Sequence, residues 1–367
     1  ASLDGPALIF AGSPRPRNYA DAPYPFRASS HFLYFAGLPL EHAALRIEGD
    51  HATLFVTPHG PADALWHGPL PGAEEISAAT GCRVRPLTEL PRAVLGAATI
   101  PAVDAATRAT QEELLGRTME RPTDADLALI DAVIALRLVH DGAAIAGLRE
   151  AAEGTAAAHF AGMKATRTGL REWHVRAAME AALIERGMAT AYGSIVSVRG
   201  EVLHNHAYHH VLSDGDLLLA DVGAENAGGW AGDVTRTWPV NGRFSASQRA
   251  IYEVVLASEV AAIEAVAPGV RYRDVHLTAA RALTEGLVAL GILRGDVDTM
   301  VADGVHALFF PHGVGHLLGL DVHDMEDLGD RAGYAPGRAR SGQFGLSYLR
   351  LDRDLAPSMA VTIEPGF

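Results

Sequence analysis

The sequence predicts an α/β protein of the mixed α+β type, with a small N-terminal mixed α/β domain and a larger C-terminal domain. Short apolar runs separated by glycine and proline turns fill the first third of the chain. Alanine-rich stretches with few helix breakers begin near residue 140. The length of 367 residues suits two or three domains. We therefore place the domains at residues 1–139 and 140–367.

Two strands and a third candidate are expected in the N-terminal domain. Residues 7–11 and 53–57 are apolar runs that end at turn-forming or strand-breaking residues, Gly12 and Pro58. Residues 31–35 are aromatic and end before a glycine, so they read as a further strand.

The C-terminal domain should begin with two helices and continue with strands and further helices. Ser245 and Gln248 form a capping-box pattern, in which the serine hydroxyl bonds a free amide and the glutamine reaches back. Glycines end several of the helical stretches. The expected helices are residues 142–164, 171–186, one from Ser245 towards Pro268, and 274–290, and the expected strands are 194–198, 216–223 and 230–240.

Composition and charge exclude several classes of partner. The net charge of −14 repels nucleic acid and anionic lipid. No run approaches the roughly 18 apolar residues of a membrane span, and the start of the chain has no signal-peptide pattern. The single cysteine, Cys82, forms no internal disulfide. We therefore expect a cytoplasmic protein without nucleic-acid or membrane partners.

Two aspartates point to a cation. Asp221 ends an apolar strand, where an unpaired carboxylate is costly to bury, and Asp233 lies in the next expected strand. A hairpin folded near residues 227–228 places the two side chains nearly opposite each other on one face. A shared cation would remove their repulsion. A bare pair of this kind is more often one N-cap aspartate and one salt-bridged aspartate.

Histidines and a glutamate follow further along. His312, His316 and His323 lie among glycines and aliphatic residues in the run PHGVGHLLGLDVHD at residues 311–324, and histidine is both a common metal ligand and an acid/base. Glu364 ends a β-rich run before a Pro-Gly turn, a pattern that alone more often marks a surface glutamate. A further histidine cluster starts at His204, of which one or two should face a site.

The ordered set of these segments resembles the pita-bread metallopeptidases. It comprises Asp221, GDVTRT at residues 232–237, the run at 311–324 and EPG at 364–366. The N-terminal runs YPFR at 24–27, SHFLYFAG at 30–37 and LWHG at 65–68 are similar to the domain shared by aminopeptidase P and prolidase. The resemblance covers nearly the whole chain and implies a C-terminal pita-bread domain.

The resemblance also implies roles for individual residues. Asp221, Asp233, His316 and Glu364 match four ligands of a dinuclear metal site. His204 and His323 match two histidines that stabilise an oxyanion, and His312 matches a histidine of the proline pocket. Trp66 matches a tryptophan that reaches an active site, which can be a neighbouring subunit's.

The implied activity is release of the N-terminal residue from Xaa-Pro peptides by attack of a metal-bridging hydroxide. Oxygen-rich ligands with one imidazole suit two divalent ions, with Mn²⁺ first and Co²⁺ or Zn²⁺ as substitutes. Glu364 would take the proton and pass it to the proline nitrogen. The substrate is a peptide with proline at its second position, and the family resemblance implies a homodimer or homotetramer.

The sequence departs from the family pattern in two places, which leaves two alternative functions open. The family has a fifth ligand, a glutamate some tens of residues after Glu-Pro-Gly, whereas this sequence stops at Phe367, so we expect further residues beyond it. Residues 325–355 are longer than in short bacterial aminopeptidase P and somewhat prolidase-like. The alternatives are a prolidase restricted to Xaa-Pro dipeptides and a catalytically silent binding module.

Overall fold

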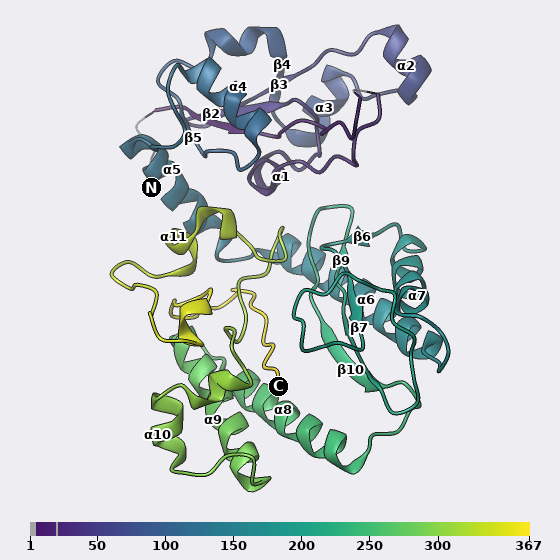
Figure 1. Cartoon of the computed structure of the whole chain (residues 1–367). Coiled ribbons are helices and arrows are strands. Elements are labelled where there is room, and N and C mark those ends of the chain that lie inside the picture. The colour runs from purple at the N-terminus through teal and green to yellow at the C-terminus, as the bar shows by residue number, and fades with distance from the viewer. Residues whose placement is uncertain (1–4, 20) are drawn as a thin grey trace. The chain divides into compact units, whose positions relative to one another are not determined.

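A computed structural model of the chain describes residues 5–19 and 21–367. The chain divides into two compact units, Ala1–Leu136 and Arg137–Phe367, and Figure 1 shows helices and strands in both. This confirms the predicted α+β class. No helix among the described residues is long and apolar enough to cross a membrane.

The N-terminal unit is built on a five-stranded mixed sheet with the order β4-β3-β2-β1-β5. The central strands β1, β2 and β3 pair antiparallel, whereas β5 and β4 pair parallel at the two edges. The strands are β1 Ala7–Phe10, β2 Ala44–Glu48, β3 His51–Val56, β4 Arg83–Pro86 and β5 Ala98–Thr99. The helices are α1 Ser30–Ala36, α2 Pro61–His67, α3 Ala73–Thr80, the 3₁₀ helix η1 Leu87–Arg92, α4 Ala105–Leu115 and α5 Asp124–Arg137.

Both faces of this sheet are buried. Side chains alternate along a strand, so Leu8 and Phe10 of β1 pack in one cluster with Leu90 of η1, while Ile9 packs in the other with Phe32 of α1. Burying side chains of this size stabilises the unit by about 1.5–3 kcal/mol each.

The expected strand at residues 31–35 is wrong, because these residues form helix α1. Phe32 and Ala36 are four residues apart and buried, so the run presents one helical face to the core. Tertiary packing therefore overrides the strand preference of the aromatic residues. Gly37 ends the helix in the left-handed conformation with φ 69°, and its N–H bonds the carbonyl of Leu33.

The C-terminal unit packs helices against two small antiparallel sheets, β10-β8-β7 and β6-β9. The strands are β6 Ala189–Thr190, β7 Ile195–Ser197, β8 Leu217–Asp221, β9 Ala224–Glu225 and β10 Thr235–Pro239. The helices are α6 Gly142–Ala165, α7 Glu172–Ile184, α8 Ala246–Ala265, α9 Tyr272–Ala289, α10 Val297–Ala302 and α11 Asp330–Gly333, with 3₁₀ helices η2 Val305–Leu308, η3 Glu326–Leu328 and η4 Leu346–Tyr348.

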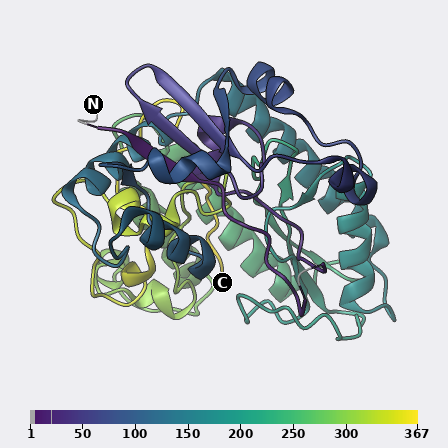
Figure 2. The ribbon, with the colours of Figure 1, turned by 90° about the horizontal axis from the view of Figure 1, so that it is seen from above.

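Two helix pairs frame this unit. Helices α6 and α7 pack together, as do α8 and α9. In both views the last residues, drawn in yellow, run between the half that carries α6 and α7 and the half that carries α8 and α9 (Figure 1, Figure 2). This last stretch carries Glu364, one of the candidate ligands.

Most elements predicted for this unit are confirmed within a few residues. The four helices correspond to α6, α7, α8 and α9, and two of the strands to β7 and β8. The capping box is present, since the hydroxyl of Ser245 accepts from the amide of Gln248 and the Gln248 side chain accepts from the amide of Ser245. The strand expected at residues 230–240 is shorter, because β10 begins only at Thr235.

Candidate metal centre

The two aspartates lie on one face of a hairpin, as the sequence predicts. Strands β8 and β10 pair antiparallel, with Thr235 opposite Asp221. Asp233 lies two residues before Thr235, outside the strand rather than within it. An even offset keeps Asp233 on the face of Asp221, so the two carboxylates are diagonal neighbours rather than direct partners.

Close backbone packing brings the two aspartate-bearing segments together. The amide of Gly232 donates to the carbonyl of Ala224 at 2.7 Å. A Cβ atom on Gly223 would lie 1.8 Å from the carbonyl oxygen of Gly232. Only glycine fits at position 223, because any side chain would force apart the segments that carry the two carboxylates.

Tyr192 joins the carboxylates, and sequence reasoning missed it. Its hydroxyl lies within hydrogen-bonding distance of both, contacting Asp221 and lying 2.9 Å from Asp233. The amide of Ala191 donates to the carbonyl of Gly223, which holds Tyr192 beside the end of β8. Burial, and then the two carboxylates, raise the pKa of Tyr192 well above its usual value, so the hydroxyl keeps its proton and acts as a donor.

His316 and Glu364 are positioned by a short backbone ladder. The amide of His316 donates to the hydroxyl of Thr362 at 3.0 Å, and the amide of Thr362 donates to the carbonyl of His316 at 3.0 Å. The amide of Glu364 donates to the carbonyl of Val314 at 2.8 Å. Two segments nearly fifty residues apart in sequence are thereby fixed side by side.

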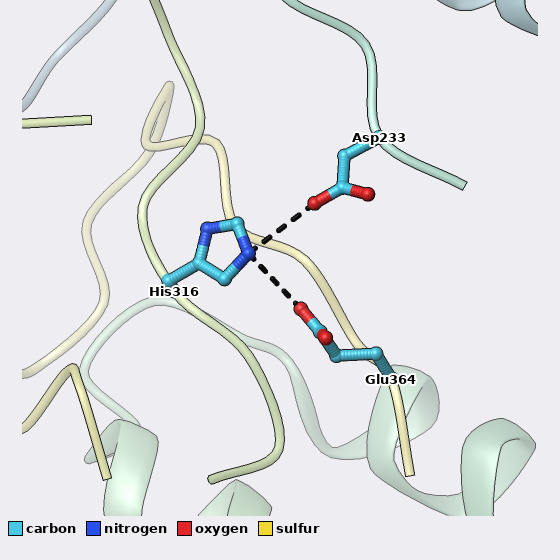
Figure 3. A group of neighbouring side chains, drawn as sticks. All are labelled: Asp233, His316 and Glu364. Atoms are coloured by element: carbon cyan, nitrogen blue, oxygen red, sulfur yellow. Dashed lines mark ion pairs between the residues drawn. The ribbon is translucent and has the colours of Figure 1, made fainter. Parts of the chain in front are cut away.

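Three of the predicted ligands meet at this ladder. Nε2 of His316 lies 3.2 Å from Oδ2 of Asp233 and 3.1 Å from Oε1 of Glu364 (Figure 3). One ligand atom from each of the three residues lies within 4.8 Å of the others. Asp221 joins them through Tyr192 and Asp233.

The tautomer of His316 suits a metal ligand. Its Nδ1 lies 2.9 Å from the carbonyl oxygen of Leu317, and a carbonyl only accepts, so Nδ1 carries the proton. The lone pair of neutral His316 is then on Nε2, which faces two carboxylates. That arrangement is repulsive unless a proton or a metal cation lies between them.

The pKa shifts of these residues also indicate a site for a cation. Burial alone would lower the pKa of His316, but its hydrogen bonds to Asp233 and Glu364 outweigh burial and raise it to about 10. Burial, and then the charge of Asp233, raise the pKa of Asp221 to about 7. Burial raises the pKa of Glu364, yet hydrogen bonds from His316 and Thr362 bring it below its ordinary value. The crowded carboxylates therefore hold excess negative charge that a divalent cation would neutralise, and their oxygen-rich donor set with one imidazole fits such an ion.

His323 also lies at this cluster. Its ring centroid is 4.0 Å from that of His316. Flanking aspartates fix its loop, because the buried guanidinium of Arg137 pairs with Asp324 at 2.6 Å and with Asp321 at 3.6 Å. Removing one partner of such a buried pair costs about 3–5 kcal/mol, so this loop is held firmly.

The other predicted site residues occupy different places. His312 lies beside the Glu-Pro-Gly run at residues 364–366, since a Cβ on Gly366 would be 3.5 Å from its Nε2. His204 is exposed in the loop between β7 and β8, and the group of possible metal ligands in the described part of the chain does not include it. Trp66 lies in α2 of the N-terminal unit with 79% of its surface exposed.

Comparison with known proteins covers both units. The model of metallopeptidase family M24 matches residues 146–367, and that of the aminopeptidase P N-terminal domain matches residues 2–99. The Xaa-Pro aminopeptidase of Escherichia coli K12 is 33% identical over 98% of this chain and 82% of its own length. A probable Xaa-Pro aminopeptidase of Emericella nidulans is 33% identical over 94% of this chain and 76% of its own.

Solved structures of aminopeptidases are similar to this chain over most of its length. Aminopeptidase PepP of Pseudomonas aeruginosa superposes with a TM-score of 0.83 at 29% identity, covering 100% of this chain and 83% of that one. Zinc-substituted aminopeptidase P of Escherichia coli, in complex with product, superposes with a TM-score of 0.79 at 31% identity, covering 98% of this chain and 89% of that one.

Proposed function

The chain belongs to metallopeptidase family M24, and from this premise we propose that it is an Xaa-Pro aminopeptidase, which releases the N-terminal residue from peptides whose second residue is proline. The membership confirms the predicted family, a pita-bread domain preceded by an aminopeptidase P-type domain. The observation that carries the proposed activity is His316 Nε2 set between two carboxylates, within a chain similar over nearly its full length to Xaa-Pro aminopeptidases. We keep residues 1–139 and 140–367 as the proposed domain limits.

The proposed metal ligands are Asp221, Asp233, His316 and Glu364, and the proposed cofactors are two divalent cations, Mn²⁺ first and Co²⁺ or Zn²⁺ as substitutes. Bound there, the cations would acidify water and polarise the scissile carbonyl. Glu364 would take a proton on its carboxylate and deliver it to the nitrogen of the departing proline. Tyr192 would hold Asp221 and Asp233 in place through its hydroxyl.

The remaining residues have proposed roles around the substrate. His323, lying against His316, and His204 would donate to the oxyanion that develops on the scissile carbonyl. His312 would line the proline pocket beside the Glu-Pro-Gly run. Trp66, exposed on α2, would reach an active site, which can be that of a neighbouring subunit in a homodimer or homotetramer. We propose a cytoplasmic location for this peptidase.

The test is hydrolysis of Arg-Pro-Pro beside the dipeptide Ala-Pro, using metal-stripped protein with and without added Mn²⁺. Mn²⁺-dependent release of arginine from the tripeptide is the expected result. Cleavage of Ala-Pro alone would make the protein a prolidase. Cleavage of neither peptide by protein that binds Mn²⁺ would overturn the proposed activity and favour a silent binding module.

A further inference from the structure

The segment after His323 turns back towards that histidine. Met325 adopts the left-handed conformation with φ 58°, which costs a residue other than glycine roughly 1 kcal/mol or more. Its side chain is buried, which offsets this cost, and the amide of Glu326 donates to the carbonyl of His323 at 3.2 Å. The sharp turn at Met325 therefore brings the side chain of Glu326 beside the imidazole.

Each oxygen of the Glu326 carboxylate has its own partner. Oε2 contacts Nδ1 of His323, and Oε1 accepts from a guanidinium nitrogen of Arg350. A carboxylate accepts, so Nδ1 of His323 carries the proton and Nε2 is the ring nitrogen left for another group. The hydrogen bond from His323, and then the charges of His323 and Arg350, lower the pKa of Glu326 to about 2 despite partial burial, which keeps the carboxylate ionised at neutral pH.

Arg350 anchors this arrangement from 24 residues away in sequence. Its neighbour Leu349 is buried and follows η4, and the amide of Leu349 donates to the carbonyl of Leu346, the first residue of η4. The Glu326–Arg350 pair is partly exposed, and an isolated pair of this kind contributes little to stability. The pair therefore matters for geometry rather than for stability. Arg350 restrains the carboxylate of Glu326, and that carboxylate restrains the imidazole of His323.

We infer that Glu326, held by Arg350, is a positioning residue that keeps the proton on Nδ1 of His323 and fixes the orientation of the ring for the reaction. The inference rests on the proposed function, in which His323 acts on the scissile carbonyl. A carboxylate behind an imidazole orients the ring and stabilises its doubly protonated form, in which Nδ1–H donates to the carboxylate and Nε2–H can donate to the oxyanion. Residues 325–355 thus supply a part of the catalytic apparatus.

The experiment is a double-mutant cycle with the full chain, loaded with Mn²⁺ and given Arg-Pro-Pro. Glu326→Ala should lower kcat by about 10-fold, the lower end of losses for outer partners of catalytic groups, with KM within about threefold of wild type. Glu326→Gln, which keeps an acceptor oxygen but loses the charge, should restore part of that loss. In a His323→Ala background, Glu326→Ala should cause no further loss.

Arg350 and a control pair sharpen the test. Arg350→Ala should lower kcat when Glu326 is present and have no effect in the Glu326→Ala background. Glu253→Ala breaks an exposed Glu–Arg pair with Arg249 in the same unit and should leave kcat unchanged. Additive losses for Glu326 and His323, or a rise in KM for Arg350→Ala that persists without Glu326, would overturn the inference.

A second readout separates this inference from the proposed activity. In zinc-loaded protein with isotope-labelled histidine, the Nδ1–H signal of His323 is assigned by its loss in His323→Asn. Glu326→Ala should shift that signal, and Glu253→Ala should not. An unchanged signal in Glu326→Ala refutes the positioning role even if no peptide is cleaved, whereas failure of wild-type protein to cleave Arg-Pro-Pro refutes only the activity.

Discussion

Acid should destabilise the C-terminal unit through His276, a fully buried residue of α9. Its ring lies 5.3 Å from that of Phe310 and 5.8 Å from that of His306. Neither nitrogen of the His276 ring has a hydrogen-bond partner among the described residues. Burial, and then the neighbouring His306, lower the pKa of His276 to about 3, so the folded protein keeps this imidazole neutral.

The sign and size of the effect follow from linkage. An unfolded histidine titrates near pH 6.5, so above that pH neither state carries the charge. Below it, the unfolded chain binds a proton that folded His276 does not, and the free energy of unfolding falls as the pH drops from 6.5 towards 3. At pH 5 the loss spans about 1.5 pH units at 1.36 kcal/mol each, or about 2 kcal/mol.

The assay compares wild type with His276→Leu, which removes the unpaired nitrogens at similar volume. Urea unfolding is followed by tryptophan fluorescence at pH 8 and pH 5, with a chelator present. Both proteins carry Trp66→Phe, so that the remaining tryptophans, Trp173, Trp230 and Trp238, all report on the C-terminal unit. The stability gained by the leucine variant relative to wild type should be about 2 kcal/mol larger at pH 5 than at pH 8. The same difference at both values would refute a buried neutral imidazole.

Three further substitutions test the metal centre and its scaffold. Asp233→Asn should lower Mn²⁺ affinity by about 100-fold, because it removes a carboxylate from the cluster; titration calorimetry measures this, and unchanged affinity would contradict the ligand assignment. Tyr192→Phe should cost about 10-fold in the same assay, since the two carboxylates lose their shared donor. Gly223→Ala should destabilise the fold by about 3 kcal/mol in thermal unfolding, because its Cβ would meet Gly232, whereas Gly142→Ala, in open space on α6, should not.

Sequence reasoning found the carboxylates because their signals are local. Asp221 ends an apolar strand, and the period of two together with the position of the turn places Asp233 on the same face. The observed strand register pairs Asp221 with Thr235, two residues away from the expected pairing with Asp233. A shift of two residues leaves Asp233 on the same face of the hairpin as Asp221. Ser245 shows the same principle for helices, because a capping box is complete within four residues.

The missed residues depend on contacts between distant segments. Tyr192 reaches the aspartates only because β6 pairs with β9, and nothing in its own neighbourhood marks it. Thr362 precedes a recognisable Glu-Pro-Gly run, but its bonds to His316 require that ladder to form. Glu326 is different, since an acid three residues after His323 is visible in the sequence; only the turn at Met325 shows that the two side chains meet.

The same short stretch of chain supports both histidine-bearing loops. A Cβ on Gly313 would lie 2.9 Å from Cα of Leu349, so the backbone at residues 348–349 packs directly on the loop of His312. The next residue, Arg350, holds Glu326 and through it His323. A displacement of residues 348–350 therefore moves the support of His312 and that of His323 together. Within the proposed function, we expect such a displacement to affect both the fit of proline in its pocket and the orientation of the imidazole at the scissile bond, because close-packed segments transmit strain.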